Sequence, residues 1–255
     1  MRFASLGSGS EGNGLVVESG GTRVLIDCGF GVRGAATRLG RLGLAPSSIT
    51  AILVTHEHSD HVGGVPAFAA RHGIPVWATF GTLAAVSERF EGMTHIHRFD
   101  SHDPPFAIGA LEITPVPVPH DAREPVQYVI GDGDRRLGVL TDIGVSTPHV
   151  EASLSGCDAL VLECNHDLEL LENGDYPYPL KQRIAGPRGH LHNGAAADIL
   201  ACIDTSGLKH IIAAHLSKQN NTKELAQTAL SAALGCSPDW IGIADQKTGF
   251  DWREM

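Results

Sequence analysis

Short apolar runs recur along the whole chain and are separated by glycine, proline and charged residues. Runs of this length that are rich in β-branched residues predict β-strands, and those bounded by polar residues, such as 51–55 and 158–163, predict buried ones. The predicted strands cover residues 2–6, 15–18, 23–27, 51–55, 75–78, 95–98, 111–116, 126–130, 136–141, 158–163, 210–214 and 240–243.

Stretches with start and stop signals predict helices between these strands. Asn193 and Thr222 are suitable N-caps, and Gly235 follows the last periodic position of its segment. The predicted helices cover residues 34–44, 65–73, 82–90, 193–203 and 222–234.

Both halves of the chain contain several β runs followed by alternating helix and strand. This order fits an α/β fold in which two sheets pack face to face with helices outside, a four-layer αββα sandwich. The 255 residues contain no linker, low-complexity segment or short internal repeat. We therefore expect one domain over residues 1–255.

Four candidate metal ligands follow the predicted strand 51–55 within six residues: His56, His58, Asp60 and His61. A loop at the end of a buried strand is a place where a rigid scaffold presents side chains to a cleft. Neutral imidazole and carboxylate are ligands that Zn²⁺ and similar ions prefer. The loop therefore predicts a metal site.

Three further candidates stand at the ends of later predicted strands: His120, Asp142 and His215. Strand ends converge on one rim of a sheet, so these side chains can meet the histidine loop in space. Five histidines and two carboxylates exceed the needs of one tetrahedral zinc, and no thiolate accompanies them. The set predicts two divalent ions, Zn²⁺ or Mn²⁺, that share a carboxylate.

Three other features permit two interpretations. Asp27 ends a predicted strand and is either a turn former or a carboxylate that orients the metal loop. The glycine-rich segment 7–14 favours a flexible hairpin turn over a role near substrate phosphate. Segment 176–183 joins aromatic and basic residues, but alone it favours a proline-rich loop with solvated charges over a nucleic-acid contact.

Composition limits the location and the partners of the protein. The net charge of −10 argues against non-specific, counterion-driven DNA binding, so metal ions or a local basic patch would have to offset the repulsion of a nucleic acid. Five dispersed cysteines favour a reducing compartment. Neither a signal peptide nor a membrane-spanning run is recognisable. We expect a cytoplasmic protein of undetermined oligomeric state.

The pattern His56-x-His58-x-Asp60-His61, followed by His120, Asp142 and His215, resembles the metallo-β-lactamase fold superfamily. The resemblance covers essentially the whole chain and implies an αββα sandwich with metals at one edge. It assigns one ion to His56, His58 and His120, the other to Asp60, His61 and His215, and a bridging role to Asp142. It also implies that Asp27 orients the loop without binding metal.

Finer features resemble the bacterial YycJ/WalJ type, which is related to ribonuclease Z and implies 5′-to-3′ exonuclease activity on DNA. These features include the segments 5–13, 162–167 and 189–193. The resemblance implies catalytic roles for Asp60, His190 and Glu163, with His190 protonating the leaving oxygen and Glu163 orienting it. This chain has His192 where the type usually has serine, so either histidine could serve, and position favours His190. Candidate substrate contacts are Tyr176, Lys181, Arg183, Asn193 and Ser217.

Three functional hypotheses follow. The first is a dinuclear metal phosphodiesterase that acts as a nuclease on single-stranded or end-exposed nucleic acid. The second is a hydrolase of a small cyclic phosphodiester of the phosphoribosyl cyclic phosphate type, which would suit the net negative charge. The third is a metal-binding regulatory protein without activity, against which the intact ligand set argues.

Overall fold

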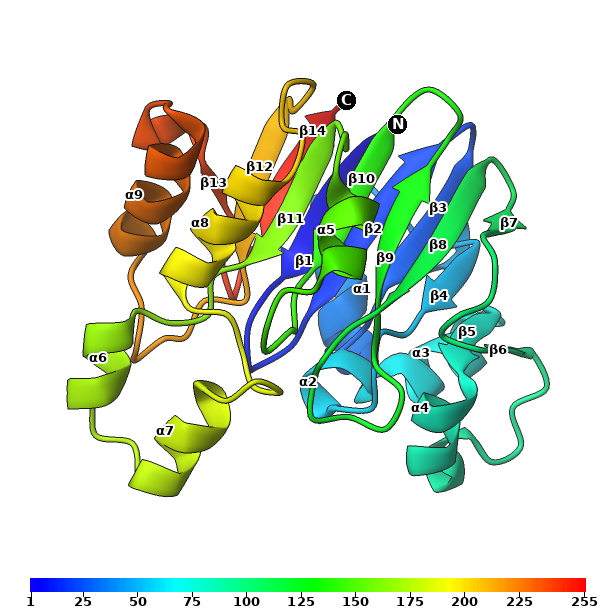
Figure 1. The fold of residues 1–255 in the computed structure, drawn as a ribbon. Coiled ribbons are helices and arrows are strands. Elements are labelled where there is room, and N and C mark those ends of the chain that lie inside the picture. Colours follow the sequence, from blue (N-terminus) through cyan, green and yellow to red (C-terminus); the bar gives the residue numbers. More distant parts are fainter.

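Two seven-stranded sheets pack face to face, and helices cover their outer faces (Figure 1). The computed structural model describes residues 1–255. The observed layers confirm the predicted αββα sandwich. Both chain ends lie at one end of the sandwich, opposite the end where α2 and α7 are found.

The first sheet begins antiparallel and continues parallel from β3 onward. Its order across the sheet is β14 (Phe250–Glu254), β1 (Arg2–Gly7), β2 (Gly14–Ser19), β3 (Thr22–Ile26), β4 (Ala51–Leu53), β5 (Val76–Thr79) and β6 (Ile96–Phe99).

The second sheet has a parallel half and an antiparallel half that meet at β10. Its order is β13 (Gly242–Ile243), β12 (His210–Ala214), β11 (Ala159–Glu163), β10 (Arg136–Leu140), β9 (Val126–Gly131), β8 (Leu111–Pro117) and β7 (Phe106–Ile108). The prolines of β8 are tolerated because β7 pairs only with residues 111–113, which leaves the rest of β8 at an open edge.

The helices are short, and none is long and apolar enough to cross a membrane. They are α1 (Val32–Arg41), α2 (Ser59–Val62), α3 (Val65–His72), α4 (Phe80–Ala85), α5 (Pro148–Leu154), α6 (Leu168–Asn173), α7 (Tyr178–Ile184), α8 (Asn193–Cys202) and α9 (Lys223–Leu234), with 3₁₀ turns at Pro46–Ser48, Ser87–Phe90 and Pro238–Trp240.

Three apolar layers of similar size hold the sandwich together, with 22, 22 and 21 buried residues. Successive strand residues point to opposite faces, so Phe3 of β1 lies between the sheets while Ala4 contacts the outer helical layer. Helices α1 and α3 cover the first sheet, and α5, α8 and α9 cover the second. Burial on both faces explains why few strands show strict polar alternation.

The structure corrects several boundaries predicted from the sequence. The predicted strand 51–55 ends at Leu53, and the predicted helix 82–90 divides into α4 and a 3₁₀ turn. Segment 176–183 is not an irregular loop, because α7 begins at Tyr178 with Pro179 in its first turn, where a missing N–H costs nothing. Elements β7, β14, α2, α5 and α6 escaped prediction.

Tyr128 of β9 ties the two sheets together directly behind the histidine loop. Its side chain is fully buried, and its hydroxyl donates a hydrogen bond of 2.7 Å to the carbonyl of Val54. Tyr128→Phe leaves that carbonyl without its partner, so we expect the free energy of unfolding to fall by about 1–2 kcal/mol. Urea denaturation measures the change, and Tyr178→Phe, at a position 70% exposed, is the matched control. Equal stability of the two variants would contradict this prediction.

Candidate metal centre

Asp27 holds the histidine loop from behind. It follows β3 with a positive φ of 59°, a conformation that non-glycine residues seldom adopt. Its Oδ1 accepts a hydrogen bond from the Thr55 backbone N–H at 2.8 Å, and its Oδ2 accepts from the Thr55 hydroxyl at 2.8 Å and from His61 Nδ1 at 2.7 Å. The carboxylate is buried, so these contacts satisfy it and fix the loop.

The same network determines which nitrogen of His56 carries the proton. Because the Thr55 hydroxyl donates to Asp27, its oxygen accepts from His56 Nδ1–H at 2.9 Å. The other ring nitrogen, Nε2, therefore carries a free lone pair. It is buried and has no hydrogen-bond partner. Such an atom is costly unless a ligand occupies its lone pair.

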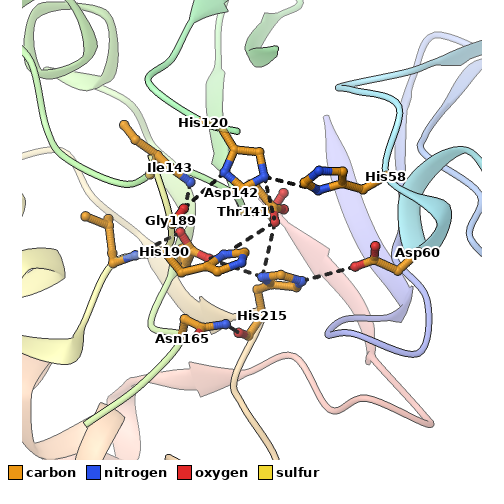
Figure 2. A network of polar contacts seen from close by, with 12 residues as sticks. His58, Asp60, His120, Thr141, Asp142, Ile143, Asn165, Gly189, His190 and His215 are labelled. Atoms are coloured by element: carbon orange, nitrogen blue, oxygen red, sulfur yellow. Dashed lines mark hydrogen bonds and ion pairs between the residues drawn. The ribbon is translucent and has the colours of Figure 1, made fainter. Parts of the chain in front are cut away.

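Two more imidazoles complete a first cluster with His56. The Nε2–H of His58 donates to the Asp121 carbonyl at 3.2 Å, and the Nδ1–H of His120 donates to the Gly189 carbonyl at 3.0 Å. The remaining nitrogens, His58 Nδ1 and His120 Nε2, lie 3.3 Å apart (Figure 2). One ligand atom from each of the three histidines lies within 4.8 Å of the others.

Asp60, His61 and His215 form a second cluster beside the first, again with ligand atoms within 4.8 Å of one another. The Nε2 of His215 lies 3.5 Å from Asp60 Oδ2, and that of His61 lies 3.4 Å from it. His215 has a φ of 55°, and its backbone N–H donates to the Ser8 hydroxyl at 3.0 Å. The strained residue is thus held by the glycine-rich segment 7–14.

Asp142 lies between the two clusters and is 1% exposed. Its Oδ2 is 3.1 Å from His61 Nε2. Its Oδ1 is 3.9 Å from His120 Nε2 and 3.4 Å from His215 Nδ1 (Figure 2). Asp142 also groups with His56 and His61 within ligand distance. Two adjacent clusters joined by a buried carboxylate are consistent with a dinuclear metal site.

The donor set fits divalent cations electrostatically as well. Burial lowers the pKa of His56 and of His120, so both are neutral and able to bind a metal. Burial also opposes the charged form of His61 and His215, but the Asp142 carboxylate outweighs it, raising the pKa of His61 well above its ordinary value and that of His215 to about 10. The buried Asp142 carboxylate thus favours positive charge at His61 and His215, and a bound metal ion would supply that charge in place of protons.

Glu163 holds the opposite side of the site from the end of β11. Its Oε1 accepts from His190 Nδ1–H at 2.7 Å and from His215 Nδ1–H at 3.1 Å. Its Oε2 accepts from the backbone N–H groups of Ile143 at 2.9 Å and Leu191 at 3.2 Å. These four contacts satisfy a carboxylate that is fully buried.

Of the two histidines that the sequence left as alternatives, the structure brings His190 to the cleft. Burial disfavours its charged form, but the Glu163 carboxylate raises the pKa of His190 above its ordinary value. His192 instead caps α8, because its Nδ1 accepts from the Ala195 backbone N–H at 3.1 Å. Serine is a standard N-cap, so His192 replaces it in that structural role. The prediction from sequence that Asn193 is the N-cap of this helix is wrong, because His192 is the N-cap.

A cleft of about 370 Å³ opens over the two clusters. Among the predicted substrate contacts, Tyr176, Arg183 and Ser217 line it. The structure does not bring the other two there: Lys181 Nζ donates to the Glu172 carbonyl at 2.7 Å, and Asn193 is buried in a paired hydrogen bond with Asn221. The remaining lining residues are Ser10, His58, Ser59, Asp60, Asp121, Asp142, Asn165, Leu180, Ile184, Gly189, His190, His215 and Leu216.

Sequence reasoning missed Asn13 and Asp121. The Asn13 amide nitrogen donates to Asp60 Oδ2 at 3.2 Å and lies 3.0 Å from His61 Nε2, and the Asn13 backbone N–H donates to the Asp60 carbonyl at 2.8 Å. Segment 7–14 connects the antiparallel strands β1 and β2, as expected of a hairpin turn, and it also packs against the metal loop and supports it. Two sequence features could have pointed to them: Asn13 lies in a polar, glycine-rich turn, and Asp121 directly follows His120.

His166 remains outside this arrangement. It is fully buried, and neither ring nitrogen has a hydrogen-bond partner. Burial lowers the pKa of its imidazole to about 4. It does not line the cleft.

The fold and the paired clusters define a metallo-β-lactamase type of hydrolase. A family model described as "Beta-lactamase superfamily domain" matches residues 22–215, and the chain belongs to this superfamily. The metallo-β-lactamase fold protein YhfI from Bacillus subtilis has a TM-score of 0.76, with 17% identity over 99% of each chain, which supports the fold.

Two curated relatives are more similar in sequence. Exodeoxyribonuclease YycJ of Bacillus anthracis is 35% identical over 235 residues, which is 92% of this chain and 89% of the relative. Exodeoxyribonuclease WalJ of Streptococcus pneumoniae is 31% identical over 250 residues, which is 95% of this chain and 91% of the relative. The resemblance to the YycJ/WalJ type is thereby confirmed.

Asp27 can be tested apart from catalysis. Asp27→Asn keeps the shape but replaces one acceptor oxygen by a donor that opposes His61 Nδ1–H or the Thr55 hydroxyl. We expect metal affinity to fall about 10–100-fold, because His61 loses its orientation. Competition with a chelating dye measures the change, and Asp134→Asn, on the exposed hairpin between β9 and β10, is the control. Wild-type affinity in Asp27→Asn would show that the carboxylate does not position the loop.

Proposed function

We propose that this protein is a dinuclear metal-dependent phosphodiesterase that degrades single-stranded or end-exposed DNA from its 5′ end. The observation that carries the proposal is the His190–Glu163 pair, with its 2.7 Å hydrogen bond, at the mouth of two His/Asp clusters. The exodeoxyribonuclease names of both curated relatives, each aligned over more than nine-tenths of this chain, support the DNA substrate.

The residues proposed to hold the ions are those whose ligand atoms converge in the two clusters. His56, His58 and His120 would bind one ion, Asp60, His61 and His215 the other, and Asp142 would contribute to both. A donor set of nitrogen and oxygen atoms suits Zn²⁺ and Mn²⁺ alike. When bound, the ions would activate a water molecule and neutralise phosphate charge.

His190 is proposed as the general acid. Its Nδ1–H is committed to Glu163, so its Nε2 is the nitrogen available to the cleft, and 20% of its side chain is exposed. The Glu163 carboxylate raises the pKa of His190 and so favours the protonated ring, whose Nε2–H can be given to the departing 3′ oxygen. Glu163 stabilises the imidazolium until that transfer and fixes the ring orientation.

The cleft offers further contacts to a nucleic acid. Tyr176 can stack a base, while Arg183 and the hydroxyl of Ser217 can contact phosphate. A small cyclic phosphodiester is the second candidate, because the cleft also presents Asp60, Asp121 and Asp142, which disfavour a long polyanion.

Substrate choice is tested by giving metal-loaded protein 5′-phosphorylated single-stranded DNA and, separately, a phosphoribosyl cyclic phosphate. We expect mononucleotides to be released from the 5′ end of the DNA, and phosphorothioate linkages at that end to block release. Electrophoresis and liquid chromatography follow the products. Turnover of the cyclic ester alone would refute the nuclease.

His190→Ala separates acid catalysis from metal binding. For DNA, whose leaving group needs a proton, we expect the turnover rate to fall about 10²–10⁴-fold. For bis(p-nitrophenyl) phosphate, whose leaving group departs as an anion, we expect a much smaller loss. Metal content is measured in parallel, and His192→Ser, which preserves an N-cap, is the control. Equal losses on both substrates would exclude the acid role.

A further inference from the structure

Arg183 is the only lysine or arginine side chain that lines the cleft. The same walls carry the carboxylates of Asp60, Asp121 and Asp142, and the whole chain has a net charge of −10. Apart from bound metal ions, a polyanionic strand therefore meets one permanent cation here. The orientation of that guanidinium is decisive for how such a strand binds.

Asp121 determines this orientation. Its Oδ2 accepts a hydrogen bond of 2.6 Å from Arg183 Nε. Asp121 is the only protein acceptor for Arg183, whose side chain is 59% exposed. Both Nη groups are therefore available, and the planar guanidinium can present them together to phosphate oxygens.

Asp121 is itself fixed to the first histidine cluster. It follows His120 directly, and its backbone carbonyl accepts from His58 Nε2–H at 3.2 Å. Its Oδ1 is buried, has no hydrogen-bond partner, and lies 3.5 Å from His120 Nε2 and 3.6 Å from His58 Nε2. The carboxylate thus joins a rigid part of the site to α7, the helix that carries Arg183 (Figure 1).

Stability alone gives little reason for this ion pair. An ion pair whose arginine is mostly exposed contributes little to folding, because solvent screens it. An arginine that is already oriented, in contrast, loses less conformational entropy when it binds a ligand. The arrangement therefore has its main effect on binding.

We propose that Asp121 is a positioning residue that holds Arg183 as a subsite for a phosphodiester flanking the scissile one. This inference rests on the proposed nuclease function. It predicts that the enzyme favours chains with at least one phosphate beyond the cleaved linkage. In this proposal Asp121 acts through Arg183 and does not itself bind the reacting phosphate.

The test is a double-mutant cycle of Arg183→Ala, Asp121→Ala and the double variant. The substrates are a thymidine dinucleotide, which has one phosphodiester, and a longer thymidine oligonucleotide. For Arg183→Ala we expect KM on the oligonucleotide to rise about tenfold with kcat little changed, and a much smaller rise on the dinucleotide. Arg188→Ala removes an exposed arginine that does not line the cleft and serves as the matched control.

The cycle then identifies how Asp121 acts. We expect Asp121→Ala to raise KM on the oligonucleotide severalfold in the wild-type background and to have no added effect when Arg183 is already alanine. Metal content should stay unchanged, and Asp121→Glu, which keeps the charge, should recover part of the loss. A persistent effect in the Arg183→Ala background, or loss of metal from Asp121→Ala, would overturn the proposal.

Failure of the nuclease function gives a different result. In that case the wild-type enzyme cleaves neither thymidine substrate. If the wild type cleaves both with equal KM, and Arg183→Ala changes neither, the nuclease function stands and the flanking subsite is refuted.

Discussion

Two buried carboxylates, one behind each side of the site, organise the whole catalytic edge. Asp27 follows β3 of the first sheet and holds His61 and the Thr55 turn, while Glu163 ends β11 of the second sheet and holds His190 and His215. Asp27 also accepts one backbone N–H and Glu163 accepts two, so each carboxylate fixes the chain path and the ring orientation together. A buried carboxylate tolerates no missing partner, which makes these networks rigid.

Rigidity of the networks determines where free lone pairs remain. Once a protein acceptor has taken one nitrogen of each ring, His56 Nε2, His58 Nδ1 and His120 Nε2 converge with no competing choice of tautomer. The unpartnered Asp142 Oδ2 and His215 Nε2 lie beside them. An apolar sandwich would not keep such atoms buried without a compensating ligand, so the same physics that folds the edge prepares it for cations.

The metal loop and the strand ends were predictable from sequence, whereas the support around them was not. Ligand type and spacing make the metal loop recognisable in the sequence at His56, His58, Asp60 and His61, and apolar runs make the strands recognisable. The pairing of β14 with β1 depends on contacts between the two ends of the chain, which no local pattern reports. Likewise, Asn13 and Asp121 take part only through tertiary contacts.

Helix α7 is a second case in which tertiary contacts, and not the local sequence, determine the structure. Its proline-rich sequence resembles a loop, yet Gly189 packs so closely against its last turn that an added Cβ would lie 2.1 Å from the Ile184 carbonyl oxygen. The His190 backbone N–H also donates to that carbonyl at 2.8 Å, and the Gly189 carbonyl fixes the tautomer of His120. Tertiary contacts with the active site therefore hold a helix that local propensity does not predict.

The residues that would hold the ions and the residues that would select the substrate differ in how deeply they are buried. The groups that would hold the ions come from loops and strand ends fixed by three apolar layers, whereas α7 contributes no fully buried residue and α6 contributes only Leu171. Changes in α6 and α7 consequently cost little folding energy. Yet α7 places Leu180, Arg183 and Ile184 on the cleft wall. A fold of this kind can alter which phosphodiester it accepts through this segment while the hydrolytic edge stays unchanged, because the two depend on different parts of the core.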